Sequence, residues 1–177
     1  MANSSDYVGA LESFWAETRP EVDMNQYAAA IRLIRIGRLL QESLRTISSQ
    51  NGLSVRGDYE VLATLRRSRP SPLTPGVLAQ QSMLTTAGMT GRLDRLESAG
   101  LIFRSSNPAD RRSVLVSITA NGSAMADRIL DSSVDHIATR VLGDVPVDWD
   151  LINDVLVDVL RLLEPSWAPS AGTPEAL

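Results

Sequence analysis

The chain has 177 residues, a formal net charge of −4, no cysteine and one histidine. The length suits one domain or two small lobes with a shared core, and the lack of cysteine excludes disulfides, thiol redox sensing and thiolate zinc sites within this chain. No apolar run approaches the length of a membrane span, and acidic residues interrupt the first apolar residues, so we expect a cytoplasmic protein without a signal peptide or membrane partner.

Three helices are predicted before residue 70. The first covers residues 6–18, where Trp15 belongs to a helical pattern of apolar residues, and the second covers residues 26–49. The apolar surface of the second helix is too wide for a one-sided helix, so more than one neighbour should bury it. A third helix follows within residues 54–69 and ends in a cluster of arginines.

Residues 74–100 have the pattern of two helices joined by a turn. Thr74 is a favourable N-cap residue, Pro75 fits the first helical position, and Gly100 is favourable just beyond the second helix. Three apolar residues share one face of the second helix and are expected to pack on two residues of the first: Met89, Leu93 and Leu96 on Val77 and Leu78.

A β-hairpin is predicted after these helices. Its strands cover residues 101–104 and 113–118, and apolar and polar residues alternate along the second strand. The connecting loop turns at residues 107–110 and carries Arg111 and Arg112. A helix-turn-helix followed by such a hairpin is a winged helix, in which one helix enters the major groove of DNA while the wing reaches the backbone or the minor groove.

The chain is therefore predicted to be mainly α-helical with a small β wing, in four parts. Residues 1–50 hold the extra N-terminal helix and a long dimerisation helix, and residues 51–118 form the winged helix-turn-helix lobe. Residues 119–163 hold the C-terminal dimerisation helices, beginning at a Thr119 cap, and residues 164–177 have the composition of a disordered tail. The terminal helices carry more apolar surface than one small lobe can cover, so two copies are expected to pack together.

The charge is distributed unevenly along the chain. Residues 56–112 contain nine arginines and five acidic residues, a net +4, whereas the rest has eight arginines and sixteen acidic residues, a net −8. A positive lobe beside a negative one can bind phosphates on one face. All seventeen basic residues are arginine, a side chain suited to phosphate and base-edge contacts.

Three segments resemble the MarR family of bacterial transcriptional regulators: LTPGVLA at 73–79, MTGRLDRLESAGLI at 89–102, and DRRSVLVSIT at 110–119 followed by Gly122. The similarity extends over residues 20–163 or so. It implies a homodimeric winged-helix regulator that binds double-stranded DNA at a pseudo-palindromic operator. It also implies a repressor of the kind that a small aromatic or phenolic ligand often releases from DNA.

Eight residues are candidate DNA contacts. They lie in the second helix of the helix-turn-helix, in the turn before that helix, and in the wing: Thr86, Ala87, Thr90, Gly91, Arg95, Asp110, Arg111 and Arg112. Family members commonly carry a base-reading arginine or asparagine where this chain has Gly91, so direct readout is expected to be sparse. Arg95 either contacts guanine or a phosphate, or pairs with a nearby carboxylate of the protein. The wing is either a solvated hairpin with a brace between Asp110 and Arg112, or it inserts an arginine into a narrow minor groove with Asp110 positioning the wing, and the two roles are compatible.

The predicted N-terminal helix resembles that of the urate-responsive branch of the family. The resemblance implies a ligand site formed by Trp15, Glu60 and Arg92, with a wing arginine nearby, although Glu60 stands where that branch has an aspartate. Alternatively, Phe14 and Trp15 form a hydrophobic plug against Tyr59. The expected ligand is a small aromatic or anionic molecule, with urate as the first candidate.

Enzymatic activity is not expected. The sequence has no phosphate-binding loop, no nucleophile elbow and no cluster of metal ligands, so no catalytic residue, metal or cofactor is predicted. Aspartates that repeat every four positions within residues 127–135 and 150–158 are expected to face water. The alternative function is a winged-helix protein-interaction module without a ligand response.

Overall fold

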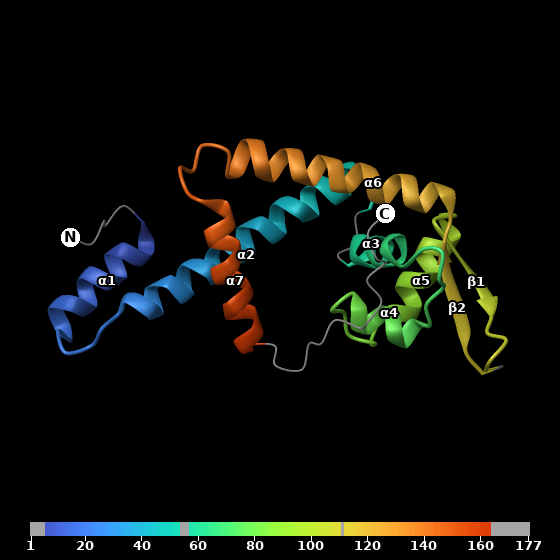
Figure 1. Ribbon diagram of the computed structural model, residues 1–177, viewed down its shortest axis with the longest axis horizontal. Helices are drawn as coiled ribbons and strands as arrows, with labels where there is room; N and C mark the ends of the chain where they lie inside the picture. The colour runs from blue at the N-terminus through green and yellow to red at the C-terminus, as the bar shows by residue number, and fades with distance from the viewer. Residues whose placement is uncertain (1–5, 54–56, 111, 164–177) are drawn as a thin grey trace. The chain divides into compact units, whose positions relative to one another are not determined.

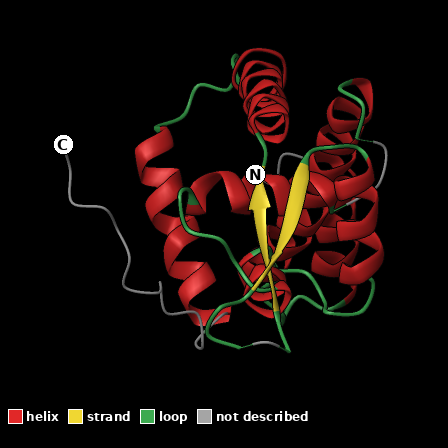
Figure 2. Ribbon diagram, turned by 90° about the vertical axis from the view of Figure 1, so that its right-hand side faces the viewer, coloured by secondary structure: helices red, strands yellow, loops and turns green. Residues whose placement is uncertain are grey.

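The computed structural model describes residues 6–53, 57–110 and 112–163, and it confirms a mainly helical fold with a small β wing (Figure 1). The helices are α1 (Tyr7–Thr18), α2 (Asn25–Gln50), α3 (Asp58–Ser68), α4 (Pro75–Gln81), α5 (Met89–Ser98), α6 (Ala120–Asp135) and α7 (Trp149–Leu163), and a π-helical segment, η1 (His136–Val141), follows α6. The strands, yellow in Figure 2, are β1 (Ile102–Ser106) and β2 (Val114–Ile118). Two compact units divide between Asp135 and His136. The predicted tail at 164–177 lies outside the described residues.

The predicted N-terminal helix, α1, packs against α2 through small buried residues and ion pairs. Val8 of α1 and Ala28 of α2 are each 1% exposed. The carboxylate of Asp6 caps α1 and also lies 3.2 Å from the guanidinium of Arg32 in α2. Arg32 pairs with Glu12 as well, at 2.7 Å. These contacts hold α1 against α2 although much of the apolar surface of α1 stays exposed, including Phe14.

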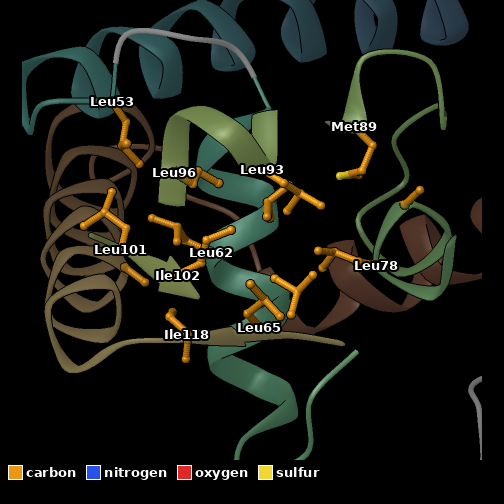
Figure 3. Close-up of a cluster of buried hydrophobic side chains, with 14 of the residues drawn as sticks. Leu53, Leu62, Leu65, Leu78, Met89, Leu93, Leu96, Leu101, Ile102 and Ile118 are labelled. Carbon is orange, nitrogen blue, oxygen red and sulfur yellow. The ribbon is translucent and has the colours of Figure 1, made fainter. Parts of the chain in front are cut away.

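A hydrophobic core lies between α3, α4, α5, α6 and the β-hairpin (Figure 3). Leu62 of α3, Leu78 of α4 and Leu93 of α5 point toward one another there and are almost fully buried. Burying such side chains stabilises the fold by about 1.5–3 kcal/mol each. The core therefore fixes the position of α5 relative to α3 and α4, which matters because α5 and the turn before it carry five of the eight candidate DNA contacts.

The prediction that Val77 packs in this core is wrong. Val77 is 38% exposed, whereas Leu78 and Ala79 are buried. In a helix each residue is rotated by about 100° from the one before it, so Val77 turns outward when Leu78 and Ala79 face the core. Thr74 and Pro75 open α4 as predicted, with the Thr74 hydroxyl accepting a hydrogen bond from the Val77 backbone N–H.

The β-hairpin gains a third short segment that the sequence pattern did not indicate. β1 and β2 pair antiparallel, from Ile102 opposite Ile118 to Ser106 opposite Val114. Leu73, just before α4, bridges to Val116 of β2 through two backbone hydrogen bonds of 3.1 and 2.8 Å. The hairpin is thereby joined to the start of the helix-turn-helix as well as to its end.

The beginning of α6 packs closely against the beginning of β1. Thr119 caps α6 as predicted, because its Oγ1 accepts a hydrogen bond from the Gly122 N–H at 3.0 Å. The same hydroxyl donates to the Gly100 carbonyl at 2.8 Å. Gly122 is needed here because a Cβ at this position would lie 2.0 Å from the Leu101 carbonyl oxygen. The backbone of α6 therefore approaches the strand more closely than any side chain would allow.

The second unit is the part that begins at His136, and it contains η1 and α7. None of the residues of α7 is buried, and Leu151, Val155 and Leu160 are more than half exposed. Among the described residues, no helix is long and apolar enough to span a bilayer. Within this second unit, the apolar side chains of α7 therefore stay uncovered.

Candidate nucleic-acid interface

The outer face of α5 and the turn before it carry the predicted groove-facing residues. All are exposed: Thr86, Ala87, Thr90, Gly91 and Arg95. The inner face of the same helix is held in the core by Met89, Leu93 and Leu96, which are at most 3% exposed. The prediction of which side of α5 is buried and which side is exposed is therefore confirmed.

Arg95 pairs with a carboxylate that the sequence did not single out. Its Nε and Nη2 atoms donate hydrogen bonds to Asp58 at 3.4 and 3.1 Å. Arg92 Nη1 donates to the same carboxylate at 3.3 Å. Asp58 is the first residue of α3 and its side chain is only 5% exposed. Arg95 is thus ion-paired within the protein, with a partner 37 residues away, and its contact with guanine or phosphate stays a prediction.

The close packing at Asp58 depends on the glycine before it. Gly57 has a φ of +89°, and a Cβ there would lie 2.4 Å from Arg92 Nη1. A glycine adopts this left-handed conformation without strain, so the guanidinium of Arg92 can lie directly over the backbone. In the sequence, Asp58 is only an acidic residue that follows a glycine near the start of a predicted helix. This pattern does not indicate which arginine the carboxylate contacts.

Arg104 of β1 connects the wing to α5. Its Nη1 lies 2.7 Å from the Asp94 carboxylate, and its Nη2 donates to the Thr90 carbonyl at 3.4 Å. The backbone N–H of Arg104 donates to Glu97 at 3.0 Å. The side chain of Arg104 is 25% exposed, so water screens this ion pair only in part. These contacts give the wing and α5 a defined relative position, and sequence reasoning missed them.

Asp110 folds the tip of the wing. Its carboxylate accepts a hydrogen bond from the Arg112 backbone N–H at 2.9 Å, the geometry of an Asx turn. Asn107 and Ser113 close the loop with a 2.7 Å side-chain hydrogen bond. The predicted brace between Asp110 and Arg112 therefore forms through the backbone of Arg112, whose side chain is exposed. Arg111 lies outside the described residues.

Within the described residues, two of the three predicted ligand residues, Trp15 and Glu60, line different pockets. Trp15 lines a pocket of about 370 Å³ with Arg19, Met24 and Tyr27, and its ring meets Phe14 edge to face at 5.3 Å. Glu60 lines a different pocket, between α2 and α3. Phe14 is exposed rather than plugged into the core.

The pocket that Glu60 lines has a volume of about 370 Å³ and mixed charge, and its walls include Arg38, Arg45, Glu42 and Tyr59. Gly57, which Arg92 covers, is also part of the wall. Burial, followed by the nearby carboxylates of Glu60 and Asp127, raises the pKa of Tyr59, so its phenol stays protonated at neutral pH.

Two of the charged residues in this pocket, Glu42 and Arg45, form an ion pair. Arg45 donates a 2.6 Å hydrogen bond to Glu42 and thereby lowers the pKa of Glu42. No group of three or more potential metal-binding side chains occurs in residues 6–53, 57–110 and 112–163. The wall of this pocket thus combines apolar, aromatic and charged side chains.

Known proteins resemble this chain in sequence and in fold. Residues 55–114 match the model of the MarR family. The HTH-type transcriptional regulator PecS of Dickeya dadantii (strain 3937) is 33% identical over 123 residues, which are 69% of this chain and 74% of PecS.

Two solved structures share the fold. Sco3205, a MarR family regulator from Streptomyces coelicolor in complex with DNA, gives a TM-score of 0.71 at 20% identity, over 84% of this chain and 91% of that one. CouR from Rhodococcus jostii RHA1, bound to p-coumaroyl-CoA, gives a TM-score of 0.63 at 25% identity, over 80% of this chain and 95% of that one.

Proposed function

Because this chain belongs to the MarR family of transcriptional regulators, we propose that it is a cytoplasmic homodimeric repressor that a small aromatic or anionic ligand releases from a pseudo-palindromic operator. The family consists of transcriptional regulators rather than enzymes. The observation that carries the proposal is the exposed face of α5 held beside the wing by Arg104. A dimer seated on a promoter blocks transcription by occupying it.

DNA binding rests on the shape and charge of the lobe between α3 and β2. The outer face of α5 suits the major groove, where Thr86, Ala87 and Thr90 are placed to contact thymine methyl groups or phosphates. Gly91 offers no side chain for a base contact. The wing arginines then supply much of the attraction to phosphate, in keeping with the net +4 of residues 56–112.

Substitution Arg112→Ala is expected to weaken operator binding by about 1–3 kcal/mol if this arginine reads the groove. The reason is that Asp110 fixes the backbone of Arg112 at the tip of the wing. Fluorescence anisotropy with labelled operator measures the loss. Arg128→Ala on α6 removes an exposed arginine away from the wing and is the matched control. Equal affinities of wild type, Arg111→Ala and Arg112→Ala would show that the wing does not contact DNA.

Dimerisation rests on apolar faces that a single chain leaves open. Leu33, Ile34, Ile36 and Leu39 of α2 are 43–67% exposed, and α7 has no buried residue. A monomeric protein rarely exposes so many large apolar side chains together. Sedimentation at micromolar concentration should give about twice the chain mass of 19.2 kDa. A monomer that binds operator tightly would contradict the proposed assembly.

The ligand is proposed to bind beside Glu60, in the pocket between α2 and α3, where Arg92 covers Gly57 of the pocket wall. An arginine can pair with an anionic oxygen of the ligand, and Glu60 can accept a ligand N–H. Trp15 lines another pocket of the same chain. A Trp15 side chain would therefore contact this ligand only if it came from a partner chain or if α1 moved. A ligand shifts the protein from DNA only by binding the released state more tightly.

We expect one of urate, salicylate and related acids to release the protein from its operator in a titration. Arg92→Ala and Glu60→Gln should raise the required concentration about tenfold or more, as loss of a charge-assisted hydrogen bond does. Trp15→Ala tests whether α1 contributes, and Tyr27→Ala, in the wall of the Trp15 pocket, is its control. If no compound releases DNA, or if the variants respond as wild type does, the ligand proposal is refuted.

A further inference from the structure

The ion pair between Asp58 and Arg95 links the start of α3 to the exposed face of α5. The carboxylate is nearly buried, with a side chain 5% exposed, whereas the guanidinium side chain is 47% exposed. One end of the pair is therefore fixed in the protein, and the other end lies at the surface assigned to DNA. An exposed arginine usually has several conformations, but this one has a buried anchor.

The contact uses only one edge of the guanidinium. Nε and Nη2 of Arg95 face the two oxygens of Asp58, at 3.4 and 3.1 Å. A guanidinium has a second fork, formed by Nη1 and the other N–H of Nη2, which points away from the first. Such a fork matches the two acceptors of guanine O6 and N7, or two oxygens of a phosphate.

Gly91 leaves room beside that second fork. A Cβ at this position would lie 3.8 Å from Arg95 Nη1, so the guanidinium lies along α5 next to the glycine. Gly91 is exposed. A longer side chain there would compete with a phosphate or a base edge for the space next to Nη1. Because Gly91 has no side chain, the guanidinium of Arg95, one turn further along α5, stays accessible.

We propose that Asp58 is a positioning residue for DNA recognition, which holds Arg95 with its outer fork directed at the operator. This inference rests on the proposed DNA-binding function and deepens it. Arg95 is ordered when the protein folds, so less conformational entropy is lost on binding. The proposed target is a base edge of the operator, because a fixed fork favours one base over the many poses of a mobile arginine. A phosphate contact would instead contribute equally to all DNA sequences.

The proposal and a purely electrostatic effect predict changes of opposite sign. Asp58→Asn removes a negative charge close to the DNA-facing surface, so electrostatics alone would strengthen binding to any DNA. Loss of positioning should instead weaken binding to the operator about tenfold, a factor within the range of one bidentate base contact. Affinity for DNA of scrambled sequence should stay constant or rise.

The experiment measures the affinities of full-length wild type, Asp58→Asn, Arg95→Gln and the double variant for operator and for scrambled DNA. Wild type must first show salt-dependent operator binding, because its absence refutes the proposed function itself rather than this inference. Asp127→Asn is the control for loss of one carboxylate charge, since Asp127 forms a two-point pair with Arg66 between α3 and α6, at 3.0–3.4 Å, but is 50% exposed. Thermal unfolding identifies variants that are no longer folded.

The expected result is that Asp58→Asn and Arg95→Gln each weaken operator binding, and that the double variant is no weaker than Arg95→Gln alone. The proposal is overturned if the two losses multiply, if both DNAs are affected equally, or if Asp58→Asn binds as the Asp127→Asn control does.

Arg95→Lys covers the case in which Asp58→Asn does not fold. Lysine keeps the charge but lacks a second fork, so it should lose operator affinity while retaining affinity for scrambled DNA. Operator binding equal to wild type by Arg95→Lys would overturn the proposal.

Discussion

Replacement of Gly122 by alanine is expected to lower the free energy of unfolding by about 3 kcal/mol, the upper part of the usual cost of overpacking. The new Cβ would lie 2.0 Å from the Leu101 carbonyl oxygen and 2.8 Å from Ile118 Cγ1. The nearest atom belongs to the backbone, so no side-chain rotation relieves the clash. The beginning of α6 would have to move away from β1, which would also disturb the Thr119 hydrogen bonds.

Calorimetry at equal protein concentration should show a melting temperature lower by roughly 6–12 °C for Gly122→Ala. Gly76→Ala is the control, because a Cβ at Gly76 in α4 meets no atom within 4 Å. That substitution should leave the melting temperature unchanged or raise it slightly, since alanine favours a helix. Equal melting temperatures for wild type and Gly122→Ala would contradict the close approach of α6 to β1.

Truncation of Leu93 to alanine is expected to cost about 3 kcal/mol of unfolding free energy, within the range measured for buried leucines. Leu93 is 1% exposed and points toward Leu62 and Leu78 in the core (Figure 3). The cavity would lie directly beneath the DNA-facing side of α5. Operator binding should weaken as well, because α5 loses the contact that holds it in place.

Chemical denaturation measures this cost as a lower midpoint with an unchanged slope. Val77→Ala removes an apolar side chain from the neighbouring helix and is the control. Because Val77 is 38% exposed, it should lose less than about 1 kcal/mol, since partial burial leaves little transfer free energy to lose. If Val77→Ala lowered the free energy of unfolding as much as Leu93→Ala does, Val77 would be packed against α5 as the sequence pattern predicted.

The elements of this fold were predictable because their signals are local. Thr74 and Pro75 mark the start of α4, and Thr119 marks the start of α6 through a hydroxyl that binds the N–H three residues later. The alternation in residues 113–118 indicates β2 in the same way. Val77 was misassigned because apolar character alone does not show on which side of a short helix a residue lies.

The contacts that organise the candidate interface were not predictable, because their partners are far apart in sequence. Asp58 meets Arg95 across 37 residues, and Leu73 meets Val116 across the whole helix-turn-helix. No periodicity encodes such pairs. The ligand residues Trp15 and Glu60 were associated through family resemblance, and one chain places them in two pockets. Pocket geometry depends on packing, which the sequence pattern does not describe.

The central claim is that the lobe of α3, α4, α5 and the wing binds DNA. Its most direct test is the affinity of the wild-type protein for DNA from its own upstream region, measured by fluorescence anisotropy between 50 and 200 mM salt. We predict that the association constant falls by about a thousandfold over this range, as expected when arginines displace counterions from several phosphates. Absent or salt-insensitive binding would contradict the account and would favour a protein-interaction module.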